Sequence, residues 1–306
     1  MIPPVSLTRN VTLLGHEFFN LYLVRGKETA VVEGGVSAVT PDVLTQLNQL
    51  NVPPESISYF IVLHSHFDHM MVFSVLKERY PWVKIVSSRF NQTVFSSERI
   101  LAKIFEADCK ITFAMLERGL ISEPPVLSPK TSFPLDLPVE GNTSLDLGNG
   151  VRLTFIDTPG HSPDCLAAYY EQEGVLFCSD AAGFYIPPDL FFPNYWYSLE
   201  ESDRSFDRMK EVDPEILCRG HYGAIIGRES VRKDLQAAHQ RMRDFRPFVL
   251  DRIQSGWSVD DLTKQVTGQF SKGVLELFPD EENYRLWKLL IRRTLEHLGI
   301  EVEDQH

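Results

Sequence analysis

Short apolar runs separated by turn residues fill the beginning of the chain. Each run is too short for a typical helix and is rich in β-branched or aromatic residues, which predicts strands over residues 11–14, 19–24 and 30–32. A fourth run, Tyr59–Leu63, has the same character. It predicts a buried strand that ends directly before a polar loop.

Longer segments with a helical spacing of apolar residues alternate with these strands. Residues 40–50 predict a helix with Thr40 as its N-cap and Pro41 at its first position. Residues 70–80 predict a second helix, and a strand follows at 82–86. Strand, polar loop, helix and strand form a crossover unit, which places the loop at the carboxyl end of a parallel sheet. The alternation indicates a mixed α/β fold.

The second half of the chain repeats this mixture of strands and helices. Residues 87–122 predict an inserted helical pair, and a proline-rich loop follows at 123–140. Two hairpins come next, the first with Asn149-Gly150 as its turn; their strands are expected at 143–148, 151–157, 166–170 and 175–178. A helix over 199–212 and a strand from residue 216 precede about three amphipathic helices in 229–300.

The composition restricts the classes of partner. The chain has 306 residues, a formal net charge of −12 and 43% hydrophobic residues, as expected of a globular protein. The acidic balance argues against nucleic acid or an anionic membrane as a partner. We expect no membrane span and no signal peptide, because no apolar run has the necessary length. Four widely spaced cysteines without a C-x-x-C pair favour free thiols and a cytoplasmic location.

The polar loop after the fourth strand carries the densest chemistry of the chain. It spans residues 64–69 and reads H-S-H-F-D-H. His64 and His66 share one face through the period of two of an extended chain, and Asp68 and His69 then turn to a second position. Imidazole and carboxylate groups suit zinc, iron or manganese. The spacing excludes a helical H-E-x-x-H zinc site, and the alternative is a solvated histidine-rich turn.

This H-x-H-x-D-H pattern after a strand resembles the metal-binding motif of the metallo-β-lactamase-fold hydrolases. The resemblance implies an αββα sandwich over residues 1–228, with an added C-terminal helical segment over 229–306. Three later segments resemble the family's other ligand motifs and present His161, Asp180 and His221. Two places depart from the family pattern: Glu33 replaces an Asp-containing turn, and Met70-Met71 replace a glycine beside the pocket.

The resemblance implies two divalent metal ions per chain, which the sequence alone does not identify as zinc, iron or manganese. The first ion is expected to bind to His64, His66 and His161. The second is expected to bind to Asp68, His69 and His221, and the carboxylate of Asp180 is expected to bridge the two ions. The implied reaction is hydrolysis by a metal-activated hydroxide. Asp68 could also relay the proton, and Tyr185 is expected to bind the substrate carbonyl or to line the pocket.

The length, the Glu33-Gly34-Gly35 turn and the helical tail most resemble the quinolone-signal response thioesterases of this family. A hydrolase of a small-molecule thioester or acyl ester is therefore the leading interpretation. The alternatives are a lactonase, a glyoxalase II-type thioesterase, a phosphodiesterase, or a regulatory protein with incidental hydrolysis. Asp180 disfavours a β-lactamase. His66 stands where flavodiiron reductases have Glu, and a flavodoxin domain is not expected, which disfavours redox chemistry.

Two further expectations concern the surroundings of the metals. Aromatic residues and prolines crowd the segments 180–188 and 191–197, which predicts an apolar pocket wall, with ordinary core packing as the alternative. The helices in 229–300 must bury their apolar faces. Because they begin soon after His221, they predict a cap over the metals that limits access to slender substrates. A homodimer contact is the alternative use of these faces.

Overall fold

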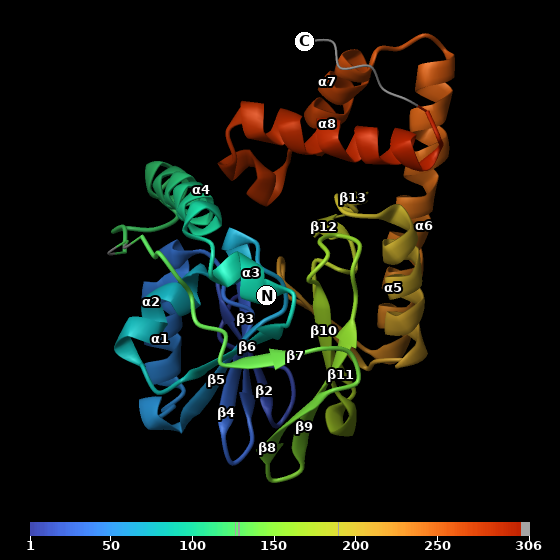
Figure 1. Ribbon diagram of the computed structural model, residues 1–306. Coiled ribbons are helices and arrows are strands. Elements are labelled where there is room, and N and C mark those ends of the chain that lie inside the picture. Colours follow the sequence, from blue (N-terminus) through green and yellow to red (C-terminus); the bar gives the residue numbers. More distant parts are fainter. Residues whose placement is uncertain (126, 128, 189, 301–306) are drawn as a thin grey trace.

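In the computed structural model, two mixed β-sheets pack face to face and helices cover their outer faces (Figure 1). The structure describes residues 1–125, 127, 129–188 and 190–300. The predicted αββα sandwich is confirmed. Within the described residues, none of the helices combines the length and the apolar character needed to cross a bilayer.

The first sheet has seven strands in sequence order. They are β1 (Val5–Ser6), β2 (Val11–Gly15), β3 (Asn20–Arg25), β4 (Thr29–Val32), β5 (Ile57–Val62), β6 (Lys84–Ser88) and β7 (Leu137–Val139). β1 to β4 are antiparallel, and β4 to β7 are parallel. The predicted crossover from β5 to β6 is confirmed, so the polar loop lies at the carboxyl edge of the parallel strands.

Helices α1 (Thr40–Gln49) and α2 (Met71–Arg79) cover the outer face of this sheet. The prediction that Thr40 caps α1 is wrong. A 3-10 turn, Ser37–Val39, leads directly into the helix, so the Thr40 N–H already bonds to the carbonyl of Ser37. Val39 therefore precedes the helix, and no side chain caps it.

The second sheet has six strands in the order β15-β14-β11-β10-β9-β8. They are β8 (Ser144–Gly148), β9 (Val151–Asp157), β10 (Leu166–Tyr170), β11 (Val175–Ser179), β14 (Ile216–Arg219) and β15 (Ala224–Ile226). β11 and β14 are parallel, while the other pairs are antiparallel. A separate hairpin, β12 (Phe184–Ile186) and β13 (Leu190–Phe192), follows β11 and precedes α5 (Leu199–Glu211).

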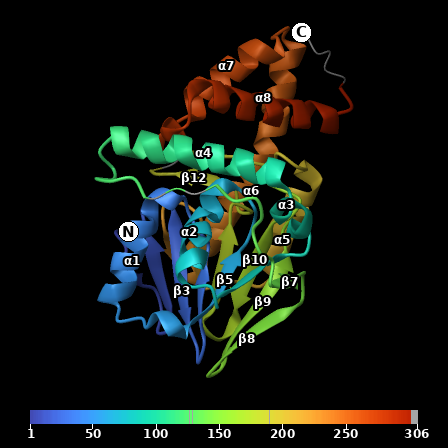
Figure 2. The same ribbon diagram turned by 60° about the vertical axis from the view of Figure 1, so that its left-hand side comes forward.

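The segment predicted as a helical pair forms the short helix α3 (Asn91–Phe95) and the long helix α4 (Glu98–Glu117). Ser97 caps α4 by accepting from the Ile100 N–H. Figure 2 shows α4 running across the sandwich beneath the C-terminal helices. It packs against both the polar loop and the tail, as expected of an insertion near the site.

The tail contains α6 (Arg228–Gln254), α7 (Val259–Phe270), a 3-10 turn Gly273–Leu277, and α8 (Asp280–His297). Residues 301–306 of the predicted segment 229–306 lie outside the described residues. Ser258 caps α7 by accepting from the Asp261 N–H. α6 runs beside α5 and packs on β14 and β15, whereas α7 and α8 lie above the sheets (Figure 1). The early part of the tail is thus integral to the core, and the boundary at 228 stays a prediction.

Candidate metal centre

The histidines and carboxylates of the predicted motifs meet at one edge of the sandwich. His64 follows β5, and His69 ends the 3-10 turn Phe67–His69. Asp180 and His221 follow the parallel strands β11 and β14. Because the carboxyl ends of parallel strands in both sheets lie at this edge, side chains far apart in sequence converge there.

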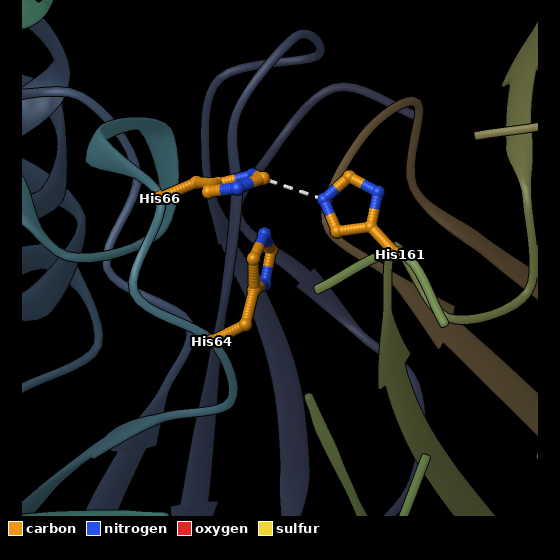
Figure 3. A group of neighbouring side chains, drawn as sticks. All are labelled: His64, His66 and His161. Atoms are coloured by element: carbon orange, nitrogen blue, oxygen red, sulfur yellow. Dashed lines mark hydrogen bonds between the residues drawn. The ribbon is translucent and has the colours of Figure 1, made fainter. Parts of the chain in front are cut away.

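Three histidines form a first group with the geometry of a metal site. The ligand atoms of His64, His66 and His161 all lie within 4.8 Å of one another. Figure 3 shows their rings converging from three directions, and His66 Nδ1 lies 2.9 Å from His161 Nε2. The structure therefore brings together the residues predicted for the first metal.

Asp68, His69 and His221 form a second group within the same limit. Asp180 lies between the two groups: its Oδ2 is 3.6 Å from His161 Nε2 and 3.7 Å from His69 Nε2. Its Oδ1 is 3.5 Å from His221 Nε2. One carboxylate thus faces the ligand atoms of both groups, which is the position that a bridging ligand requires.

Hydrogen bonds on the far side of the rings orient these histidines. Nδ1 of His161 donates to the backbone carbonyl of Asn194 (3.0 Å). Nδ1 of His221 donates to the backbone carbonyl of Phe18 (2.5 Å). Because a carbonyl only accepts, these bonds place the proton on Nδ1 and leave a lone pair on Nε2. His64 Nδ1 lies 3.0 Å from the hydroxyl of Ser179.

Unpartnered polar atoms show that this centre fits a metal. Among the described residues, the buried Nε2 atoms of His64, His69 and His221 have no hydrogen-bond partner. Leaving such groups unsatisfied costs about 1–3 kcal/mol each. Metal coordination would satisfy all three, and imidazole with carboxylate is a donor set that zinc, iron and manganese accept. The residues therefore fit bound divalent metal.

Burial keeps two of these imidazoles neutral. It lowers the pKa of His64 well below its ordinary value, and the neighbouring imidazoles act in the same direction. Burial and the nearby ring of His66 lower the pKa of His161 to about 3. A neutral imidazole offers the lone pair that a metal needs, so both side chains are ready to bind at neutral pH.

The second group has a strongly negative field. Burial lowers the pKa of His69, but the carboxylates of Asp68, Glu33 and Asp180 outweigh it and raise that pKa well above its ordinary value. Burial likewise raises the pKa of Asp180, yet the imidazoles of His69 and His221 hold it below its usual range. A charged carboxylate cluster of this kind favours a bound cation.

Glu33 has a role that the sequence left open. It is 1% exposed, and its carboxylate contacts Nδ1 of His69. The pairing of β4 with β5 continues into this turn, because the Glu33 N–H donates to the carbonyl of Ile61. The Gly34 N–H then donates to the carbonyl of His69, beyond the end of β5. A Cβ on Gly34 would lie 2.7 Å from the carbonyl oxygen of His69. Gly34 thus permits the close approach that lets Glu33 orient a ligand.

We expect Glu33→Gln to weaken metal binding at the second group about 10- to 100-fold, since partners behind a ligand have effects of this size. The amide retains an acceptor for His69 but loses the negative charge that makes the imidazole a stronger donor. Competition with a metal chelator measures the affinity. Glu28→Gln, at a carboxylate that bonds to the Tyr59 hydroxyl instead, is the matched control. Equal affinities of both variants would contradict this role.

Tyr185 does not take the predicted place at the substrate carbonyl. Its hydroxyl donates to the carbonyl of Pro188 (2.5 Å), and its ring lies over the guanidinium of Arg219. The reason is strand alternation: Phe184 precedes it on β12 and faces the metal centre, so Tyr185 points to the opposite side. Met70, which stands where the family has a glycine, packs in the hydrophobic core.

A cavity of about 260 Å³ opens above the metal centre. The floor is polar and is formed by His66, Asp68, His161 and Asp180. The walls are apolar and are formed by Phe67, Phe184, Trp196, Val274, Leu275, Phe278, Leu286 and Leu289. Phe184 and Trp196 come from the predicted aromatic wall, whereas the side chain of Phe192 lies outside the described residues. The last five belong to the tail, which therefore forms the far wall of the cavity.

Comparison with known proteins gives relatives named as metallo-beta-lactamase fold-containing and as flavo-diiron proteins. The metallo-beta-lactamase fold-containing protein ST1585 of Sulfurisphaera tokodaii is 26% identical over 224 residues, which cover 68% of this chain and 74% of that protein. The flavo-diiron protein FprA2 of Clostridium acetobutylicum is 23% identical over 74% of this chain. The match covers 53% of FprA2, so this chain spans about half the length of that relative.

One solved structure shares the fold over nearly the whole chain. The metallo-beta-lactamase family protein TTHA1429 of Thermus thermophilus aligns with a TM-score of 0.66 at 22% identity, covering 96% of this chain and 95% of that one. The shared fold thus extends into the C-terminal helices. The family model of the metallo-beta-lactamase superfamily matches residues 16–221, from the residue after β2 to His221. The chain belongs to the metallo-beta-lactamase superfamily.

Proposed function

We propose that this protein is a dinuclear metal-dependent hydrolase that cleaves a small acyl ester or thioester. The observation that carries the proposal is a cavity with ligand side chains on its floor and apolar side chains on its walls. An acyl carbonyl can reach the floor while its hydrocarbon part contacts Phe184 and Trp196. This arrangement joins a site for hydrolysis to a site for an apolar acyl group.

When bound, two metal ions would supply an activated hydroxide and stabilise negative charge on the carbonyl oxygen. The first three histidines and Asp180 would hold one ion, and Asp68, His69 and His221 with Asp180 the other. Asp68 is the carboxylate best placed to move a proton, because it lines the cavity and retains 13% side-chain exposure. Phe184 and Trp196 would orient the acyl group and exclude water from its path.

The finer assignment rests on the tail and the thiols. The helical segment beyond His221 supports membership of the quinolone-signal response thioesterase subgroup. All four cysteines are free, and three are buried, which supports a cytoplasmic location. A lactonase is a close alternative with the same requirements. A phosphodiesterase has less support, since no lysine or arginine belongs to the described lining of the cavity. The likeness to flavo-diiron proteins keeps a redox function as an outcome to test.

Metal analysis combined with a substrate screen tests the proposal. We expect close to two metal ions per chain in purified protein and cleavage of uncharged thioesters or esters. Chelation should abolish cleavage, and restored metal should recover it. Metal-free protein with full activity would refute the mechanism. Cleavage of lactones or phosphodiesters alone would select one of those alternatives, and oxygen consumption with a reductant but no hydrolysis would select the redox function.

A further inference from the structure

We infer that the tail makes the cavity selective for uncharged, apolar acyl groups over acyl groups that end in a carboxylate. The inference rests on the proposed function and names the substrate class of the same site. Five apolar side chains of the tail form the far wall: Val274, Leu275, Phe278, Leu286 and Leu289. The end of an acyl group bound at the metals must lie against this wall.

The size of the cavity decides which part of a substrate it encloses. At about 260 Å³ it is smaller than the roughly 300–1,000 Å³ of sites that enclose a drug-sized ligand. The acyl group therefore fits inside, while a larger alcohol or thiol part stays outside. Selection by the tail thus acts on the acyl group and not on the leaving group.

Two cationic side chains of α8 already have polar partners. On α8, Lys288 Nζ lies 2.8 Å from Asp260. Arg293 donates to the carbonyl of Trp196 and pairs with Glu296. A terminal carboxylate inside the cavity would face leucine, valine and phenylalanine side chains with no cation among the described lining residues. Burying an unpaired carboxylate is strongly unfavourable, so the wall rejects it.

The tail is fixed against the metal centre. Tyr222 directly follows His221, and its hydroxyl accepts from the Val274 N–H (2.7 Å). A Cβ on Gly273 would lie 2.2 Å from this hydroxyl, so glycine allows the contact. On the other side, Lys110 of α4 pairs with Glu282 (2.6 Å). These contacts hold the apolar wall at a set distance from the ligands, as selection requires.

A matched pair of thioesters tests the inference on the metal-loaded protein. Hexanoyl and adipoyl thioesters of one neutral thiol have acyl chains of equal length and differ in the terminal carboxylate. We expect kcat/KM to be on the order of 100-fold lower for the adipoyl thioester. Leu286→Arg should reduce the ratio of kcat/KM for the hexanoyl thioester to that for the adipoyl thioester about tenfold, because it supplies a cation for the carboxylate. Ile226→Arg, at an exposed apolar position of β15 away from the cavity, should leave it unchanged.

A binding measurement separates this inference from the proposed function. Hexanohydroxamate and the monohydroxamate of adipic acid provide the same two chains on a metal-binding group, and calorimetry reads their affinities without turnover. Stronger binding of the uncharged chain supports the inference even if no thioester is cleaved. Equal affinities, or equal kcat/KM values, would overturn it even if hydrolysis is confirmed. If Leu286→Arg does not fold, Leu289→Arg at the 38% exposed rim replaces it, with the same expected direction.

Discussion

Asp180→Ala should lower kcat/KM for the best ester or thioester by at least about 1,000-fold and reduce the metal content below two ions per chain. Removing a group behind a ligand costs about 10- to 100-fold, and Asp180 faces the ligand atoms of both groups, so its loss should cost more. The side chains of His161, His69 and His221 would lose the carboxylate that lies within 3.7 Å of each. Metal analysis and steady-state kinetics on the same preparation measure both effects.

Asp180→Asn separates charge from shape. The amide has the same size but carries no negative charge and offers one acceptor oxygen, so it should also lose activity, with metal content between those of the wild type and Asp180→Ala. A thermal unfolding profile checks that both variants are folded. Asp180→Ala with two bound metals and an unchanged rate would exclude the bridging role.

Gly160→Ala should lower the free energy of unfolding by about 3 kcal/mol and weaken metal binding by the first group. A Cβ at Gly160 would lie 2.6 Å from backbone atoms of Ser202, at the beginning of α5. The carbonyl of Gly160 accepts from the N–H groups of Tyr197 and Ser198, so the turn cannot move away without losing these bonds. His161 is the next residue and must shift with the turn. Chemical denaturation and metal titration measure the two effects.

Gly150→Ala is the control for backbone strain. Gly150 also has a positive φ, of 81°, but a Cβ there would meet nothing within 4 Å. Gly150→Ala should lower the free energy of unfolding by about 1 kcal/mol, because of the left-handed backbone alone, and should leave metal binding unchanged. If Gly160→Ala costs no more than Gly150→Ala, the contact with α5 has no importance for the site.

The metal ligands could be predicted because local sequence determines much of their geometry. His64 and His66 lie at the end of an apolar strand whose burial follows from its composition. His161 lies in a Pro-Gly turn after another strand, and the structure brings it to His66. A strand that ends in a polar loop specifies the edge at which its side chains lie, so the motifs carried most of the information.

Residues whose roles depend on strand register could not be assigned from the sequence. Glu33 reaches His69 only because the pairing of β4 with β5 continues past the end of the strand. Phe184 and Tyr185 are equally aromatic neighbours, and only the register of the β12–β13 hairpin decides which one faces the cavity. In the tail, Phe270 and Trp287 pack on each other, while Phe278 lines the cavity. Amphipathic spacing does not distinguish these two uses.

The bond between Tyr222 and Val274 has a thermodynamic consequence. The backbone that presents His221 to the metal also presents the hydroxyl that holds the tail, so the two events share one structural element. Any free energy by which a bound metal favours the closed tail is the same free energy by which the closed tail favours the metal. If a ligand displaces the tail and thereby lowers the affinity for metal by some factor, bound metal lowers the affinity for that ligand by the same factor. Substrate range and metal retention are therefore linked in this protein to the extent that the bond between Tyr222 and Val274 couples the tail to His221.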